Sequence, residues 1–430
     1  MIGVGPGQPD ALAPAPAGWG VGPTSVADLE ALAVLTSVNG LGPVTMGALF
    51  AAIGSPAAVL RLAAERQGAR AIAAAATNLE SGRGLPTALP DAIVAAAGRR
   101  QEILGEVARL GLQLVAIGDP EYPSRLRAIE IPPLLLYVKG DPSAFVTVHA
   151  VAVVGTRRPS DAGRRIASRI SGAVTRAGGL VVSGLAIGID GAAHAAAVGE
   201  GRPTVAFIGS GHDRLFPATH DRRAEAIVET GGAIVSEYSP GTEPTRGTFP
   251  RRNRLISGSA DAVVVVEAGA RSGALLTASW ALEQGRECFV VPGSIESPAS
   301  AGCLGFLRDW PGLARVVSGV PQLLEDLGMA AEAGIEPATA PGRQRPSSTV
   351  RPIGTEAAIA SVAAHDRPVA AALFNGAVTV DELVAITRQP VGAVLGALTR
   401  LEGAGFVEGR YGRYEVTARI ELGADARPAA

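Results

Sequence analysis

The chain has 430 residues, 47% of them hydrophobic, and a formal net charge of −2. That length allows two or three domains with a large buried core, and the near-neutral charge restricts any affinity for nucleic acid to a local patch. No apolar run reaches the length of a membrane span, and no signal-peptide pattern opens the chain. The one lysine, Lys139, lies in no GxxxxGK[ST] loop, and the absence of that loop excludes a P-loop ATPase.

Cysteine use indicates a reduced, cytoplasmic protein. Cys288 and Cys303 form no CxxC pair and no metal-binding pattern. Because Cys288 lies inside an apolar strand segment, we expect it to be a buried core thiol.

Residues 1–24 are rich in Gly, Pro and Ala and are expected to form a disordered tail, and a helical domain follows over residues 25–100. A helix that starts at Ser25 is expected to break at Asn39–Pro43, and a second helix covers Val44–Ile53. Helix, Gly-x-Gly hairpin and helix together resemble helix-hairpin-helix and SAM-like modules, whose hairpin amides can hold a DNA phosphate. The alternative is a turn chosen only for its positive φ angles.

The central region, residues 101–330, is predicted to be an α/β domain with a Rossmann-like parallel sheet covered by helices. A helix over Pro90–Gly111 leads into it, and the strands Leu112–Ile117 and Pro132–Lys139 follow. Helix-length segments separate most of the six apolar strands that come next, an alternation typical of a parallel sheet covered on both faces. These strands are Val151–Val154, Leu180–Val182, Thr204–Ile208, Ala233–Val235, Ala262–Val266 and Cys288–Val291.

Small or basic residues follow each of the six strands. If the strands run parallel, right-handed crossovers place these junctions on one edge of the sheet. That edge would carry glycines, hydroxyls, arginines and exposed amides at helix starts. Such a surface can bind a ligand with anionic oxygens, most obviously a phosphate. The junctions are Gly155–Arg158, Ser183–Gly184, Gly209–Gly211, Ser236–Glu237, Glu267–Gly269 and Pro292–Gly293. Past the first junction, Asp161 is predicted to cap a helix over Ala162–Ala177.

A basic segment, Thr242–Arg254, follows the fourth of these strands. It carries four arginines against a single acidic residue, with Phe249 among them. Pro244 and Pro250 predict that no long regular helix begins until after Arg254. Basic residues interleaved with an aromatic ring are typical of sites that bind single-stranded nucleic acid. The positive charges lie along the phosphate backbone, and the ring stacks on a base. The alternative is a solvated basic loop with Phe249 in the core.

The C-terminal part is predicted to be a winged helix that follows a linker. Residues 331–354 lose hydrophobic periodicity and gather Pro, Gly, Thr and Arg, which is typical of a linker. Residues 355–420 then contain three helical regions and a hairpin that turns near Gly412, and residues 421–430 form a tail.

The recognition-helix candidate of this winged helix is Pro390–Gly403. Apart from Arg388 and Arg400 this region carries little charge. A protein contact or a packing role therefore fits it as well as DNA readout does.

Two nucleotide-enzyme patterns are incomplete. Gly209-x-Gly211 lacks the third glycine of a dinucleotide fingerprint, because Arg214 stands there. The segment Ser272–Trp280 is comparable to the PGGxGTxxE loop of Rossmann-like phosphoribohydrolases, but Trp280 stands where the acid should be. That replacement argues against hydrolysis.

Two further catalytic patterns are weak. Asp190 and His194 are spaced like metal ligands on a helix, but no third ligand has suitable spacing, and a helix-end hydrogen bond is the better explanation. No GxSxG elbow is present, and neither Ser183 nor Ser272 has a base assignable from the sequence.

Seven motifs in a fixed order carry a resemblance to a known family. They are VAVVGTRRPSDAG (residues 151–163), SGLAIGIDGAAH (183–194), GSGHDRLFP (209–217), SEYSPGTEP (236–244), FPRRNRLISG (249–258), VVVEAGARSGALLTA (264–278) and VPGSIESP (291–298). With GDPEYPSRLRAI and PPLLLYVKGD upstream, this order resembles the DNA-processing protein A family, DprA, also called Smf. The resemblance covers residues 112–310 closely. The flanks agree loosely, since family members often have a SAM-like N-terminal domain and a C-terminal winged helix.

The resemblance implies a non-enzymatic protein that binds single-stranded DNA, and it implies no cofactor or metal. Family members protect incoming DNA during natural transformation, load the RecA recombinase onto it and displace single-strand binding protein. They form dimers through the Rossmann-like domain. Carried over by position, the implied DNA-binding residues are Gly155, Thr156, Arg157, Arg158, Ser183, Gly184, Gly209, Ser210, Gly211, Arg246, Phe249, Arg251, Arg252, Asn253, Arg254, Ser272 and Gly273.

The resemblance also implies roles within this set. Arg157 and the glycine turns line a phosphate pocket that Ser272-Gly273 closes. Arg246 contacts a phosphate and Phe249 stacks on a base, while residues 251–254 extend a basic rim.

The chain departs from the family pattern at two positions. Ile187 stands where members often have a basic residue, and Leu304 lies in a segment where many have Gly-Thr-Asn. Two alternatives of a different class remain open. One is an enzyme acting on nucleotides or nucleotide sugars, and the other is a regulator that senses a small nucleotide and signals through the winged helix.

Overall fold

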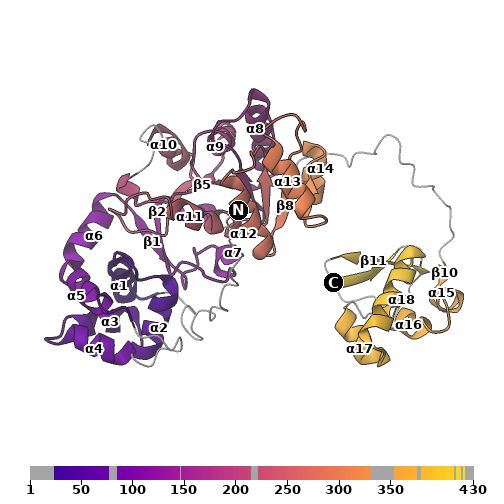
Figure 1. The fold of residues 1–430 in the computed structure, drawn as a ribbon, viewed down its shortest axis with the longest axis horizontal. Coiled ribbons are helices and arrows are strands. Elements are labelled where there is room, and N and C mark those ends of the chain that lie inside the picture. Colours follow the sequence, from indigo (N-terminus) through magenta and orange to yellow (C-terminus); the bar gives the residue numbers. More distant parts are fainter. Residues whose placement is uncertain are drawn as a thin grey trace, which may run out of the picture. The chain divides into compact units, whose positions relative to one another are not determined.

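The computed structural model forms two compact units, Met1–Ala338 and Thr339–Ala430 (Figure 1). It describes residues 24–76, 85–145, 147–214, 221–330, 353–374, 379–410, 413–417 and 420–421. The tails expected at residues 1–24 and 421–430, the linker at residues 331–354 and the turn near Gly412 lie almost wholly outside the described residues.

The described residues from 24 to 109 contain six helices, and the break expected after the first of them is confirmed. α1 begins after Ser25, whose hydroxyl oxygen accepts a hydrogen bond from the amide of Asp28 (3.1 Å). α2 begins after Gly42 and has Pro43 in its first turn, where a missing amide hydrogen costs no helical bond. The bounds are α1 (Val26–Thr36), α2 (Pro43–Ile53), α3 (Pro56–Ala63), α4 (Gly68–Ala75), α5 (Leu89–Gly98) and α6 (Arg100–Arg109).

The single helix expected over Pro90–Gly111 is wrong, because the structure has two helices, α5 and α6, that meet at Arg99. Arg99 leaves the helical conformation, with φ −99° and ψ 14°. Ile93 of α5 and Ile103 of α6 are nevertheless buried in the same core. The apolar pattern therefore continues across the break and hides it in the sequence.

The core of these helices is continuous with the core of the sheet that follows. Leu32 and Phe50 belong to the same buried cluster as Leu135 and Val263 of the sheet. The domain boundary near residue 100 stays a prediction. Among the described residues no single helix is both long and apolar enough to cross a membrane, and α2 and α3 pass that test only as a pair bent by 79°.

A nine-stranded sheet forms the centre of the first unit, in the order β1-β2-β6-β5-β4-β3-β7-β8-β9. The six strands expected to be parallel are parallel, and β9 continues their ladder. β2 pairs antiparallel with β6, and β1 pairs antiparallel with β2. The Rossmann-like fold class is confirmed. The strands are β1 (Gln113–Ala116), β2 (Leu135–Gly140), β3 (Ala150–Val154), β4 (Leu180–Ser183), β5 (Thr204–Phe207), β6 (Ala233–Ser236), β7 (Ala262–Val265), β8 (Glu287–Val290) and β9 (Ala314–Val316).

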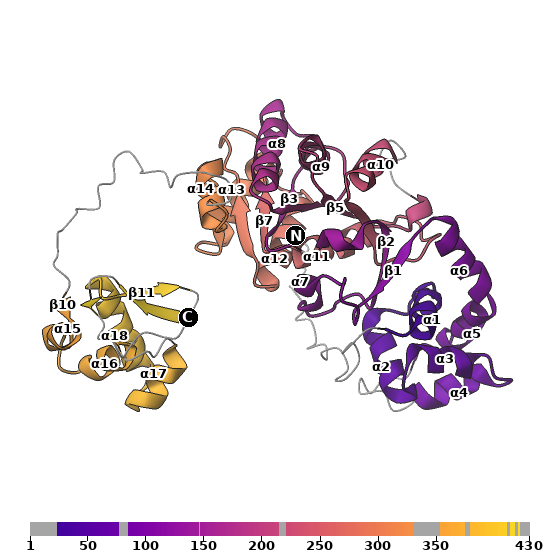
Figure 2. The same cartoon turned by 180° about the vertical axis from the view of Figure 1, so that it is seen from behind.

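Helices cover both faces of this sheet, with α8, α9 and α10 on one side and α11 and α12 on the other (Figure 2). Residues of β3 alternate accordingly. Val151 and Val153 pack in the cluster of α8 and α9, while Ala152 and Val154 pack in the cluster of α11 and α12. Burial on both faces explains why the strands are apolar throughout. The helices are α7 (Ser124–Arg127), α8 (Asp161–Arg176), α9 (Ile189–Gly199), α10 (Asp221–Glu229), α11 (Thr248–Gly258), α12 (Ala274–Glu283), α13 (Ala301–Asp309) and α14 (Val320–Asp326).

The cap expected at Asp161 is wrong by one residue, because Ser160 caps α8. The Ser160 hydroxyl oxygen accepts a hydrogen bond from the amide of Gly163 (3.0 Å). Asp161 is instead the first helical residue, and its carboxylate pairs with Arg164 (2.6 Å). A carboxylate in the first turn still interacts favourably with the helix dipole.

Both cysteines are buried free thiols. The core position predicted for Cys288 is confirmed, since its strand β8 lies inside the sheet. Burial raises the pKa of Cys288 to about 12 and that of Cys303 to about 11, so both thiols stay protonated at neutral pH.

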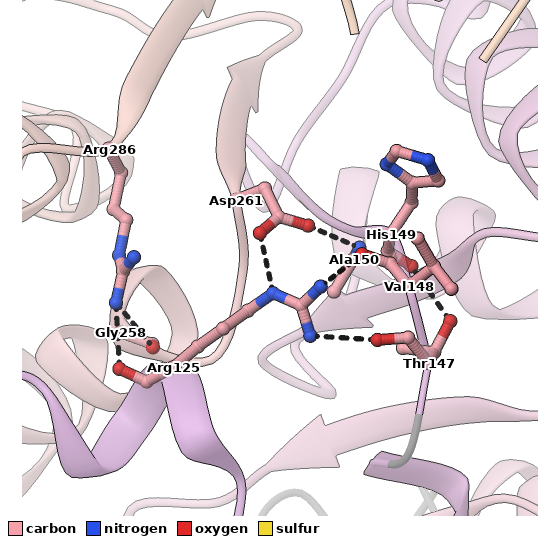
Figure 3. A network of polar contacts seen from close by, with 8 residues as sticks. All are labelled: Arg125, Thr147, Val148, His149, Ala150, Gly258, Asp261 and Arg286. Carbon is pink, nitrogen blue, oxygen red and sulfur yellow. Dashed lines mark hydrogen bonds and ion pairs between the residues drawn. The ribbon is translucent and has the colours of Figure 1, made fainter. Parts of the chain in front are cut away.

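Two partly buried arginines fasten the amino ends of two central strands to the segment that carries α7 (Figure 3). Asp261, which precedes β7, accepts hydrogen bonds from Arg125 (2.5 Å) and from the amide of Ala150 at the start of β3 (2.8 Å). Arg125 also donates to the carbonyl of Thr147 (3.1 Å), and Arg286 donates to the carbonyl of Arg125 (2.7 Å). This network stabilises the edge of the sheet opposite the strand–helix junctions.

The second unit is a winged helix, as predicted. Its helices pack around one core that includes Leu373, Leu398 and Phe406. Arg400 donates two hydrogen bonds to the buried carboxylate of Asp366 (2.8 and 2.7 Å), so this arginine ties α18 to the residue that precedes α16. The elements are β10 (Ile353–Gly354), α15 (Thr355–Ser361), α16 (Arg367–Phe374), α17 (Val380–Thr387), α18 (Val391–Gly403), β11 (Val407–Arg410), β12 (Arg413–Val416) and β13 (Ile420–Glu421).

Candidate functional site

A cavity beside β3 lies at the carboxyl ends of the parallel strands. β3 lies between β4 and β7, so the order of the strands reverses there, and ligands of open α/β sheets bind at such a point. We call it the switch-point cavity; its volume is about 820 Å³. It is lined by Val154, Gly155, Thr156, Arg157, Arg158, Ala186, Asp190, Pro244, Thr245, Arg246, Phe249, Pro250, Arg252, Asn253, Ile256, Gly269, Ala270, Arg271, Ser272, Gly273, Ala274, Leu276 and Thr277.

A smaller cavity of about 230 Å³, the Gly209 cavity, adjoins the first. The two share Arg157, Ala186, Phe249 and Arg252. The Gly209 cavity is completed by Gly184, Leu185, Ile187, Ile208, Gly209 and Ser210. The junctions after β3, β4, β5 and β7 therefore meet at one edge, as the sequence predicts.

Glu267, a residue with no predicted role, holds the turn after β3. Its carboxylate accepts hydrogen bonds from the amide of Ser160 (3.0 Å) and from the Ser160 hydroxyl (2.5 Å). Its carbonyl accepts a hydrogen bond from the amide of Thr156 (2.7 Å). The junction after β7 thus positions the arginine-bearing turn Gly155–Arg158. The glutamate directly after the β7 strand motif is the sequence signal for this contact.

The turn after β4 has an unusual backbone, and a buried carboxylate supports it. Leu185 and Gly188 both have positive φ, at 56° and 90°. The carboxylate of Asp190 accepts a hydrogen bond from the amide of Ala186 (3.4 Å). Burial, partly offset by the charge of Arg252, raises the pKa of Asp190. Asp190 therefore supports the turn, and the helix-end hydrogen bond expected from its spacing is present.

The basic segment contains a helix earlier than expected. The structure starts α11 at Thr248, so the prediction of no regular helix before the end of Arg254 is wrong. Pro250 lies in the first turn, where backbone amides have no helical acceptor and a proline removes no hydrogen bond. Thr245 prepares this start, because its hydroxyl oxygen accepts a hydrogen bond from the amide of Thr248 (3.2 Å).

The helix buries two of the arginines that were expected to extend an exposed rim. Arg252 is 5% exposed and donates hydrogen bonds to the carbonyls of Gly184 (2.6 Å) and Phe207. Arg254 is 5% exposed and pairs with Glu237. A rim position is wrong for both, because α11 is covered on two sides: Arg252 packs at the carboxyl ends of β4 and β5, and Arg254 also donates to the Ile131 carbonyl (2.6 Å). Burial lowers the pKa of Arg252 to about 10, so it stays charged at neutral pH.

Phe249 lies between two guanidinium groups at the boundary of both cavities. The guanidinium carbon of Arg157 is 5.6 Å from the ring centroid, and that of Arg252 is 6.0 Å away. The ring is half-buried, and its Cδ1 would lie 3.1 Å from a Cβ placed on Gly209. Phe249 is therefore neither a core residue nor a free ring, and Gly209 leaves the room that the ring occupies.

The start of α12 forms the far wall of the switch-point cavity. Its N-cap residue, Gly273, has no side-chain cap. Asn253 of α11 donates a hydrogen bond to the Gly273 carbonyl (3.1 Å), which joins the two helices. The amide of Ala274 donates a hydrogen bond to the Ser272 hydroxyl oxygen (3.3 Å), so the helix start at the cavity wall contributes the positive end of its dipole.

Four residues of the predicted set line neither cavity. The Ser183 hydroxyl is buried and donates a hydrogen bond to the carbonyl of Val153 (2.6 Å). Gly211 is buried against Ser239, and Arg254 is held by its ion pair. Arg251 is exposed and lines a third cavity of about 1340 Å³ that also includes the predicted hairpin Gly40–Gly42. Contact between that hairpin and DNA stays a prediction.

The switch-point cavity is strongly positive although the whole chain is slightly acidic. Five arginines and one carboxylate line it, and one of the arginines, Arg271, was not predicted. Arg157, Arg158 and Arg246 are exposed at its mouth. Ile187, the first departure from the family pattern, is 45% exposed in the Gly209 cavity and adds no charge there.

Comparison with known proteins agrees with this architecture. Residues 113–328 match the family model described as DNA recombination-mediator protein A, and residues 354–413 match the DprA winged helix domain. The chain belongs to the DprA family. The match covers the whole sheet from β1 through α14, together with both cavities, and most of the winged helix.

Individual DprA relatives are similar over most of their length. Protein Smf of Synechocystis sp. is 35% identical over 321 residues, which are 70% of this chain and 80% of the relative. DNA processing protein DprA of Bacillus subtilis is 34% identical over 225 residues, 52% of this chain and 74% of the relative. The crystal structure of DprA from Streptococcus pneumoniae superimposes with a TM-score of 0.56 at 29% identity, covering 71% of this chain and 99% of that one.

Proposed function

We propose that this DprA-family protein binds single-stranded DNA at the switch-point and Gly209 cavities, without catalysing a reaction, and delivers the strand to RecA. The observation that carries the proposal is the meeting of glycine turns, exposed arginines and one half-buried aromatic ring at a single edge of the sheet. Arginines bind phosphates whatever the base sequence, and a ring face stacks on any base. Membership of a family named for recombination mediation supports the same proposal.

Binding is tested with the full-length chain and fluorescently labelled DNA. We expect the labelled single strand to bind, and we expect no turnover of a panel of nucleotides and nucleotide sugars. Arg157→Ala should weaken binding to every sequence alike, because phosphate contacts carry no sequence information. Arg169→Ala is the matched control, since Arg169 is an exposed arginine of α8 that lines neither cavity. Equal binding by Arg157→Ala, or turnover of any nucleotide, contradicts the proposal.

Delivery to RecA, and with it protection of incoming DNA in natural transformation, is tested on strands already coated with single-strand binding protein. We expect the wild-type chain to accelerate RecA filament formation on coated strands and the Arg157→Ala chain to lose that acceleration. A wild-type chain that binds single strands but leaves RecA assembly unchanged would limit the function to binding and protection.

We also propose that the chain forms a homodimer through the outer edge of the sheet. β9 is the last strand in the order, and Trp310, Leu313 and Val316 beside it are 41%, 57% and 50% exposed. An unpaired edge with large apolar side chains favours association with a second copy. In sedimentation velocity we expect a dimer for the wild type and a monomer for Leu313→Glu. Leu395→Glu, at a 44% exposed leucine of the winged helix, should remain dimeric.

A further inference from the structure

The switch-point cavity is deeper than a groove that only follows a DNA backbone requires. Val154, Ile256 and Thr277 line it although they are at most 3% exposed, so the cavity reaches down to the core between β3, α11 and α12. Its volume of about 820 Å³ lies within the range of roughly 300–1,000 Å³ that is usual for small-molecule sites. The cavity can therefore enclose a whole nucleotide.

The arginines of the cavity carry more positive charge than the single negative charge of one internal phosphodiester balances. Four exposed arginines line the cavity, and the buried Arg252 is the fifth arginine in its lining. Arg252 is 5% exposed, and among the described residues its Nε has no hydrogen-bond partner. Because Arg252 lines the cavity, a guanidinium group with one unpaired nitrogen points to an acceptor that a ligand supplies.

A second anion-binding feature faces the same space. The ten-residue helix α12 begins at the cavity wall, where its first amide, that of Ala274, donates to the Ser272 hydroxyl oxygen (3.3 Å). The positive end of the helix dipole stabilises negative charge that lies close to it. The helix start and the buried arginine approach the cavity from different elements, α12 and α11, so they act together on a ligand that lies between them.

A phosphomonoester fits these features better than an internal phosphodiester. A diester within a strand carries one negative charge, whereas a monoester carries about 1.5 to 2 charges at neutral pH and has three acceptor oxygens. We infer that the switch-point cavity binds a nucleotide that ends in a phosphomonoester, whether it is the phosphorylated end of a DNA strand or a free nucleoside monophosphate. This inference rests on the proposed function, since the same edge of the sheet holds the rest of the strand.

The test compares four single strands of one sequence on the full-length chain. They are a linear strand with a 5′-phosphate, one with a 3′-phosphate, one with hydroxyls at both ends, and a circular strand. We expect one phosphorylated strand to bind about tenfold more tightly than the hydroxyl-ended strand, and the circular strand to bind like the hydroxyl-ended one. Free dAMP should remove that advantage by competition if a free nucleotide enters the same cavity.

Ala270→Glu locates the effect. Ala270 is an exposed cavity residue outside the predicted DNA-binding set, and a carboxylate there opposes the monoester. The variant should weaken binding of the phosphorylated strand about tenfold more than it weakens binding of the circular strand, so that the two strands then bind alike. Ala195→Glu, at an exposed position of α9 that lines neither cavity, should keep the advantage.

The outcomes separate this inference from the function on which it rests. Equal affinity for all four strands overturns the inference and leaves single-strand binding in place. An advantage that survives Ala270→Glu places the terminal phosphate elsewhere and also overturns it. Absence of binding to every strand contradicts the proposed function itself.

Discussion

Replacing Phe249 by alanine separates base stacking from packing. The ring is half-buried between Arg157 and Arg252, so its removal should cost less stability than the about 3–5 kcal/mol lost when a fully buried phenylalanine is truncated. We expect a loss of about 1–2 kcal/mol in the free energy of unfolding, in proportion to the half of the ring that is covered. Loss of a stacking face should weaken single-strand binding by about 1–3 kcal/mol, or roughly 5- to 150-fold.

The assay pairs urea unfolding with fluorescence anisotropy on a labelled single strand. Phe249→Trp should keep most of the binding because it retains a flat ring, and Phe249→Leu should bind as poorly as the alanine variant. Phe50→Ala is the control, since Phe50 is 2% exposed in α2, and it should lose stability without losing affinity in the folded chain. If Phe249→Leu binds as tightly as the wild type while Phe249→Ala unfolds as readily as Phe50→Ala, the stacking assignment is wrong.

Two further predictions concern stability. Burial lowers the pKa of His212 from 6.5 to about 4. Between these pH values the unfolded chain binds a proton at this histidine and the folded chain does not. The free energy of unfolding should therefore fall by about 3 kcal/mol as the pH drops from about 6.5 to about 4. His212→Gln should flatten that part of the pH profile, and an unchanged profile would assign the loss to other groups. Gly188→Ala should destabilise the chain by more than about 1 kcal/mol, because φ there is 90° and a Cβ would collide with the Thr156 carbonyl. Gly199→Ala, where a Cβ meets nothing within 4 Å, should not destabilise it in the same thermal melt.

The sequence predicts the sheet well because burial on both faces leaves a strong signal. Each parallel strand is a short apolar run followed within two residues by a glycine, a proline or a polar residue, and the right-handed crossover rule then places all the junctions on one edge. The Gly155–Arg158 turn and Ser272-Gly273 meet there for that reason. Helix ends are predicted less well, since Ser160 and Asp161 are both good caps and only the backbone decides between them.

The orientation of the arginines could not be predicted from composition. Residues 251–254 look like one basic run, but α11 points Arg252 and Arg254 inward and Arg251 outward. The prolines concealed this helix, because a proline is acceptable in the first turn and forbidden only later. Contacts between distant motifs leave no local signal either, as the hydrogen bonds that Ser160 donates to Glu267 show.

The salt dependence of single-strand binding tests the central claim most directly. If phosphates bind at the arginine-lined cavities, the logarithm of the association constant should fall linearly with the logarithm of the salt concentration, by about 0.7 per phosphate contacted. Arg157→Ala should reduce that slope by about 0.7 and weaken binding to poly-dT and to mixed sequences alike, while Arg169→Ala should change neither quantity. A slope and an affinity that Arg157→Ala leaves unchanged would contradict the assignment of DNA to this edge of the sheet.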